Sequence, residues 1–155
     1  MDTLPIIHRE KIGTDWIDYN GHMNEGYYPL VFSHAADVLM VNVGVSPDYI
    51  KETGKTFFTV ESHIRFLKEV KVGATVAVRI QVLGVRDKKL HLWYSMTDGD
   101  NGPEAATMES MWLFYDGKEG KVAPIANEVR RLIDDMVAAQ GDRPSPDAAG
   151  RHIAL

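Results

Sequence analysis

The chain has 155 residues, the length of one ordinary domain, and is 45% hydrophobic and 25% charged, as soluble globular proteins are. It contains no cysteine, which excludes a disulfide scaffold, Cys-ligated zinc and a thiol nucleophile. Its net charge of −5 argues against sequence-independent binding of nucleic acid. We expect neither a membrane helix nor a secretory signal, and therefore a cytoplasmic protein.

The first half of the chain predicts one strand, a polar loop and a buried helix. Residues 5–12 have a strand pattern, and residues 13–25 are rich in turn-forming Gly, Asp and Asn. Nearly every residue from 27 to 43 is apolar, which predicts a helix surrounded by protein. Pro29 would lie in its first turn, Gly44 would end it, and residues 47–53 would form a second short helix.

The second half predicts antiparallel strands and then an amphipathic helix. Strand-like alternation runs along four segments, which are residues 57–67, 75–83, 89–97 and 105–115. Residues 127–139 predict a helix capped by Asn127, followed by an extended tail over residues 141–155.

These elements together predict the fold class and the assembly. One apolar helix and one antiparallel sheet predict an α+β fold, a single domain of residues 1–140 in which about five strands wrap around the long central helix. A sheet curled on one side leaves strand edges open, so we expect a homodimer or a homotetramer.

The segment WIDYNGHMNEGYY, residues 16–28, contains the most chemically suggestive residues. It places Asp18, His22 and Asn24 around Gly21, directly before the apolar helix. An Asx turn with an asparagine helix cap would explain this composition without catalysis. The six histidines have no metal-motif spacing and no phosphate-binding glycine motif occurs, so we expect no metal and no resident cofactor.

Residues 18–28 resemble the D-x-x-G-H-[VM]-N-x-x-Y signature of hotdog-fold thioesterases of the 4-hydroxybenzoyl-CoA thioesterase type, and the resemblance extends over residues 5–125. It implies the hotdog fold and an acyl-CoA thioesterase in which Asp18 is the general base or the nucleophile. Backbone N–H groups around Gly21, near the positive end of the helix, would stabilise the oxyanion. Trp16 stands where many members carry a second aspartate.

The same resemblance suggests further site residues. His22 and Asn24 would shape the loop or hold water, and His22 could equally brace the loop. Glu61 and His63 share one strand face. They would reach the site of a partner subunit, or else form a solvated ion cluster.

The sequences of residues 16–24 and of the tail resemble those of the thioesterases of carnitine catabolism, including the domain fused to some L-carnitine dehydrogenases. This implies betainyl-CoA as the substrate, with its trimethylammonium group in an aromatic cage. Another short-chain or aromatic acyl-CoA stays open, as does a non-catalytic module that binds an acyl group or small cation. Hydratases with this fold carry an Asp/His pair in a different sequence context, which this chain does not contain. The substrate-binding candidates are Trp16, Tyr19, Tyr27, Tyr28, Glu61, His63, Trp93 and Trp112.

CoA itself carries phosphates, which basic side chains would bind. Each candidate is also explained as an ordinary surface charge. The candidates are Lys68, Lys71, Arg86, Lys88, Lys89, Arg130 and Arg131.

Overall fold

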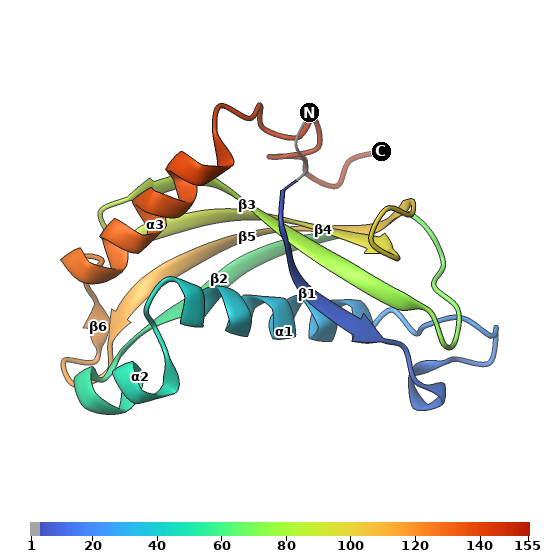
Figure 1. Ribbon diagram of the computed structural model, residues 1–155, viewed down its shortest axis with the longest axis horizontal. Coiled ribbons are helices and arrows are strands. Elements are labelled where there is room, and N and C mark those ends of the chain that lie inside the picture. Colours follow the sequence, from blue (N-terminus) through green and yellow to red (C-terminus); the bar gives the residue numbers. More distant parts are fainter. Residues whose placement is uncertain (1–3) are drawn as a thin grey trace. The chain divides into compact units, whose positions relative to one another are not determined.

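The computed structural model describes residues 4–155, within which it has three α-helices, one short 3-10 helix and six strands (Figure 1). Each predicted helix and strand is present, with ends shifted by a few residues. The helices are α1 (Tyr27–Asn42), α2 (Pro47–Thr53) and α3 (Asn127–Gln140), and the 3-10 helix is η1 (Thr14–Trp16). The strands are β1 (Ile6–Lys11), β2 (Lys55–Phe66), β3 (Thr75–Arg86), β4 (Lys89–Asp98), β5 (Glu104–Asp116) and β6 (Lys121–Val122).

The strands form an antiparallel sheet in the order β1-β3-β4-β5-β2, and β6 pairs with β5. Strand β1 pairs antiparallel with β3, with a register shift between Ile6 and His8. Strand β2 ends the order, so among the described residues one of its two edges has no partner strand. The predicted α+β class is confirmed.

The chain forms two compact units, each made from separate segments. The first unit holds the residues up to 38 together with residues 64–80 and 94–108, and the second holds residues 39–63, 81–93 and 109–155. The predicted boundary between residues 140 and 141 falls inside the second unit.

In the first unit, the N-terminal half of α1 packs its aromatic side chains against two strands. The buried ring of Phe32 meets that of Tyr94 on β4 edge to face, with centroids 5.7 Å apart. Tyr28 meets Phe66 at the end of β2 in the same geometry at 5.3 Å. Edge-to-face pairs of this kind stabilise a core beyond the burial of their area, so they hold the N-terminal half of α1 against β2 and β4.

In the second unit, aromatic residues of β2 and β5 form a buried cluster. The ring of Phe57 lies 5.6 Å from that of Trp112 and 5.0 Å from that of Phe114. Helix α3 begins at Asn127, but the N-cap position is Ala126 and no side chain caps the helix. The prediction that Asn127 caps α3 is therefore wrong, because this residue is already part of the first turn.

The tail of residues 141–155 is anchored to strands of the second unit. The side-chain amide of Gln81 donates to the carbonyl of Pro144 at 3.2 Å, and the N–H of Gly150 donates to the carboxylate of Glu109 at 2.7 Å. Beyond Gly150, the apolar side chains of Ile153 and Leu155 are exposed.

Within the described residues, no single helix has the length and apolarity to span a membrane. Helices α1 and α2 meet those criteria only when taken together, as a pair bent by 66°.

Candidate active site

A tight turn at residues 18–22 brings the carboxyl and imidazole candidates together in the first unit. The N–H of Asp18 donates to the carbonyl of His22 at 2.9 Å, and the N–H of Gly21 donates to the carbonyl of Asp18 at 3.0 Å. Gly21 has a φ of +82°, a backbone conformation that residues with a side chain rarely adopt. The oxygen Oδ1 of Asp18 also accepts the N–H of Asn20 at 2.9 Å, which orients the carboxylate.

Asn24 connects this turn to the start of α1. Its Oδ1 accepts the N–H of Gly26 at 2.9 Å, and its carbonyl accepts the N–H of Tyr27 at 3.0 Å. Its own N–H donates to the carbonyl of Trp16 at 2.9 Å. These contacts make the Asx turn that the composition alone suggested, and they place the loop directly at the N-terminus of α1.

A cavity of about 910 Å³ opens beside this loop. Five of the predicted site residues line it, which are Asp18, Tyr19, His22, Asn24 and Tyr28. The sequence did not single out Glu25, Phe66 or Glu69, which line it too. Phe66 and Glu69 come from the far end of β2 and the segment after it, so no local pattern could connect them with the loop.

The polar groups around the cavity are tied to backbone and to each other. The Nε2 of His22 lies 3.0 Å from a carboxylate oxygen of Glu69. The hydroxyl of Tyr28 donates to the carbonyl of Lys68 at 3.3 Å, and burial raises the pKa of Tyr28 above its ordinary value. Tyr28 is therefore a neutral wall residue at physiological pH, whereas three carboxylates, Asp18, Glu25 and Glu69, border the cavity.

The backbone around the loop decides which N–H groups are free to bind an oxyanion. The N–H groups of Gly21 and Gly26 already donate to the carbonyl of Asp18 and to Oδ1 of Asn24. Within the described part of the chain, the N–H of Glu25 has no such acceptor, and Glu25 lines the cavity. An unpaired N–H at the positive end of a helix is the kind of donor that stabilises developing negative charge on oxygen.

Residues 12–133 match the Thioesterase-like superfamily. This chain belongs to that superfamily. It is 38% identical to the betainyl-CoA thioesterase of Pseudomonas aeruginosa over 155 residues, which cover 100% of this chain and 98% of that protein. It is also 36% identical to the L-carnitine dehydrogenase/betainyl-CoA thioesterase of Rhizobium meliloti, covering 92% of this chain but only 29% of the length of that protein.

The fold of this thioesterase is shared with a Staphylococcus aureus protein solved in complex with CoA. The two structures agree with a TM-score of 0.91 at 24% sequence identity, covering 100% of this chain and 98% of that one. The predicted hotdog fold is therefore confirmed. The resemblance to acyl-CoA thioesterases is confirmed by the family match and the full-length relative, and the chain is a thioester hydrolase.

Several aromatic residues predicted to bind substrate are used in packing. Trp16 and Tyr27 stack face to face, with centroids 4.8 Å apart and planes inclined by 10°, and neither lines the cavity of Asp18. Trp93 and Trp112 are buried in the second unit, 7% and 3% exposed. Of the aromatic candidates, only Tyr19 and Tyr28 reach the cavity of the thioesterase, and Tyr19 is almost fully exposed.

Glu61 and His63 line a different cavity, of about 340 Å³, in the second unit. Its walls also include His91 and Glu109, whose Nε2 and carboxylate oxygen are 2.7 Å apart, and residues of the tail. The structure of a single chain therefore does not bring Glu61 and His63 to the cavity of Asp18. Their predicted reach into a partner's site concerns a second subunit and stays a prediction.

Proposed function

We propose that this thioesterase hydrolyses betainyl-CoA to glycine betaine and CoA, in the cytoplasm. One observation carries the proposal. The carboxylate of Asp18 lines a cavity at the N-terminal end of α1, in a chain 38% identical along its full length to a betainyl-CoA thioesterase. The relatives in which this activity is fused to L-carnitine dehydrogenase support the same substrate class.

The residues of the loop supply the two functions that thioester hydrolysis requires. Asp18 either deprotonates a water molecule that attacks the carbonyl carbon, or attacks that carbon itself to form an anhydride. The N–H of Glu25 stabilises the oxyanion, and the CoA thiolate then leaves. In the first route the proton taken from water passes from Asp18 to the thiolate, and in the second route water hydrolyses the anhydride. A single turnover in ¹⁸O-labelled water tests for the second route, because label enters Asp18 only when water attacks the aspartyl carbonyl of an anhydride.

The acyl group of betainyl-CoA is a quaternary ammonium cation, and the cavity is suited to attract one. The carboxylates of Glu25 and Glu69 supply negative charge, and aromatic faces attract such cations when their distance is within about 6 Å. Phe66 is half exposed on the cavity wall, and Tyr19 is almost fully exposed at the same cavity. Phe66 thus adds an aromatic residue to Tyr19 and Tyr28, the expected cage residues that line the cavity.

The CoA moiety would be held at the mouth of this cavity. Of the basic candidates, Lys68 lines the cavity, and the backbone of Lys71 pairs with that of His22 in the loop. The other candidates belong to the second unit, where Arg130 is already paired with Asp134 at 2.8 Å. We therefore assign the phosphate contact to Lys68 first.

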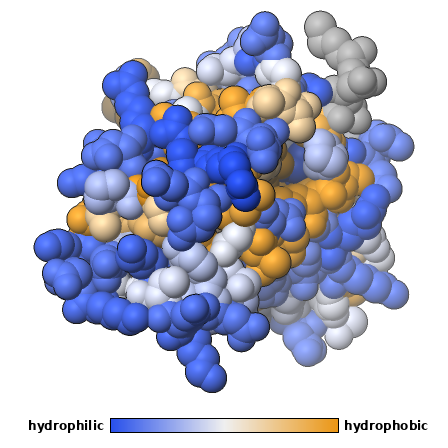
Figure 2. Space-filling model, turned by 60° about the vertical axis from the view of Figure 1, so that its left-hand side comes forward, coloured by the Kyte–Doolittle hydropathy of each residue, from blue (hydrophilic) through white to orange (hydrophobic). Residues whose placement is uncertain are grey.

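We also propose that the active enzyme is a homodimer formed through β2. This twelve-residue edge strand exposes Phe58, Val60 and Phe66, each about half accessible. An unpaired apolar edge of this length is a template for pairing with a second copy. Figure 2 shows apolar side chains (orange) reaching the surface between hydrophilic ones. Light scattering tests the proposal, and a monomer would overturn it.

The decisive experiment compares betainyl-CoA with 3,3-dimethylbutyryl-CoA, in which a carbon atom replaces the quaternary nitrogen and the shape is kept. Thiol release is followed for both esters, and each rate is divided by that of uncatalysed hydroxide hydrolysis to remove the intrinsic reactivity of the ester. A cation–π and carboxylate site favours the cation by about 0.5–2 kcal/mol, so we expect a preference of about 2- to 30-fold in kcat/KM. Glu69→Gln should reduce this preference for the cationic ester.

The other outcomes select the alternatives. Equal rates for the two esters, or faster release from acetyl-, butyryl- or 4-hydroxybenzoyl-CoA, would keep the thioesterase and overturn the betainyl specificity. Tight binding of a CoA ester with no thiol release from any of them would leave a non-catalytic acyl- or cation-binding module.

A further inference from the structure

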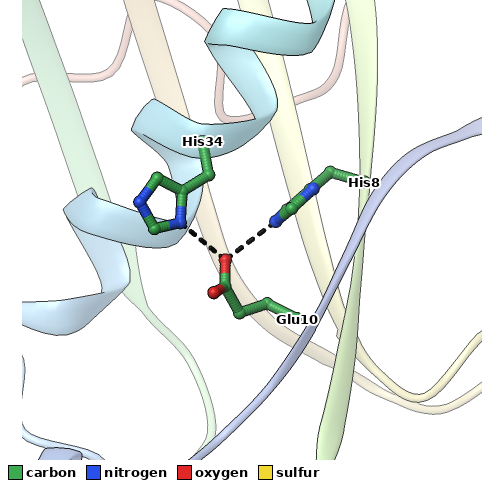
Figure 3. A group of neighbouring side chains, drawn as sticks. All are labelled: His8, Glu10 and His34. Carbon is green, nitrogen blue, oxygen red and sulfur yellow. Dashed lines mark hydrogen bonds and ion pairs between the residues drawn. The ribbon is translucent and has the colours of Figure 1, made fainter.

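Three potential metal ligands converge in the first unit, outside the candidate active site (Figure 3). His8 and Glu10 project from the same face of β1, and His34 projects toward them from α1. One carboxylate oxygen of Glu10 lies 2.8 Å from Nε2 of His8 and 2.7 Å from Nδ1 of His34. The hotdog chemistry proposed above uses none of these three residues.

The composition and partial burial of this cluster are compatible with a metal site. Two imidazoles and one carboxylate are a ligand set that binds Zn²⁺ and related ions, with room for a further ligand. The three ligand atoms lie within 4.8 Å of one another. The side chains are partly buried, 21% exposed for His8 and Glu10 and 39% for His34, so an ion could still enter from solvent.

We propose that His8, Glu10 and His34 form a binding site for one divalent transition-metal ion of the Zn²⁺ type. The ion would replace the two hydrogen bonds now made to Glu10. Ligand atoms bound at about 2.0–2.2 Å around a tetrahedral ion lie roughly 3.3 Å apart. Each nitrogen would thus have to move about half an ångström from the carboxylate oxygen, a shift within the freedom of these side chains.

Such an ion would tie the edge strand β1 to the middle of α1. Three protein ligands leave one tetrahedral position for water or a small anion. The spacing of the histidines predicted no metal, because His8 and His34 belong to separate elements and only the fold brings them together. The sequence of β1 alone places only two of the three ligands, His8 and Glu10, on one side of the strand.

The test measures Zn²⁺ binding to the full chain after treatment with a chelator. Calorimetry at pH 7.5 should give one ion per chain, and Co²⁺ should give the intense visible absorption of a four-coordinate site. His34→Asn and Glu10→Gln should each weaken the affinity by at least about tenfold. His8→Asn should do the same and provides a third variant if one of the others fails to fold, which melting of the metal-free proteins will show.

A matched control comes from the second unit. His91 and Glu109 also form a histidine–carboxylate pair at 2.7 Å, but they belong to no three-ligand cluster among the described residues. His91→Asn and Glu109→Gln should leave the Zn²⁺ affinity unchanged. Absence of a one-to-one site, unchanged affinity in His34→Asn, or equal loss in the control variants would each overturn the proposal.

Discussion

The two cavities contain similar chemical groups on very different supports. Each has a histidine paired with a glutamate, His22 with Glu69 in the first unit and His91 with Glu109 in the second. In the first, a hydrogen-bonded turn presents the side chains at the start of a sixteen-residue helix. In the second, the side chains stand on strands, and residues of the tail line the same cavity.

This difference explains why only the first cavity is a good candidate for thioester chemistry. A thioester carbonyl needs a carboxylate on one side and a donor for its oxyanion on the other. Asp18 and the free N–H of Glu25 offer both at the positive end of a helix. The second cavity is lined by residues of strands and of the tail, and the N-terminus of no described helix borders it. Titratable residues alone therefore do not make a catalytic site.

Asp18→Asn, in the first cavity, should lower the activity more than any other substitution considered. The asparagine keeps an oxygen for the N–H of Asn20 but cannot act as a base or nucleophile, so kcat/KM should fall by about 10²- to 10⁴-fold. Glu109→Gln in the second cavity serves as the control and should retain activity. Binding of a non-hydrolysable thioether analogue is measured in parallel. If both binding and activity vanish, Asp18 has a structural role instead.

Gly21→Ala tests whether the turn must be this tight. A Cβ at Gly21 would meet no atom within 4 Å, so only the φ of +82° opposes it. That conformation costs about 1–2 kcal/mol for a residue with a side chain, and kcat/KM should fall by roughly tenfold as the loop relaxes. Gly13→Ala, at a φ of −81° and also with open space, should be neutral. Denaturant titrations and kinetics on both variants provide the comparison, and equal behaviour of the two would contradict it.

His22→Gln and His91→Gln compare the two histidine–glutamate pairs directly. The contact of His22 with Glu69 is an ion pair at 3.0 Å whose glutamate is mostly exposed. Exposed pairs contribute about 0.2–1 kcal/mol, so His22→Gln should lower kcat/KM by roughly 1.5- to 5-fold. His91→Gln should leave kcat/KM unchanged, because its cavity is not the catalytic one. A larger loss in His91→Gln than in His22→Gln would reverse our assignment of the two cavities.

Periodicity predicted the elements well because each is recorded locally in the sequence. The apolar run after Tyr27 and the alternation of the strands give α1 and β2 to β5 within a few residues. The N-cap of α3 was predicted one residue too late, at Asn127 instead of Ala126. A helix start cannot be located to one residue from the sequence, because an asparagine can occupy either the cap or the first turn. Strand order and the two compact units depend on contacts distant in sequence, which periodicity does not contain.

The candidate site was predictable only as far as the loop is contiguous. Residues 18–24 are recognisable as a motif, whereas Phe66 and Glu69 enter the cavity through the fold. Only part of the expected aromatic set lines the cavity, because side-chain direction decides which rings reach it. Trp112 turns toward Phe57 rather than toward solvent, and Trp16 stacks on Tyr27.

Tyr49→Phe should have the smallest effect on catalysis, because it changes the stability of the second unit, and the pH dependence of that change lies in the alkaline range. Burial and a hydrogen bond from its hydroxyl to Glu128 at 3.1 Å raise the pKa of Tyr49 to about 12. The folded state holds this proton more tightly than the unfolded state, whose tyrosine has a pKa near 10. The contribution to stability is thus fully present below about pH 10 and is lost as the pH rises toward 12. Urea unfolding from pH 9 to 12 should show a steeper loss in the wild type than in Tyr49→Phe. Glu128→Gln should fall between them, because burial of the phenol remains when the charged acceptor is removed. Parallel curves for all three proteins would show that the contact between α2 and α3 does not hold this proton.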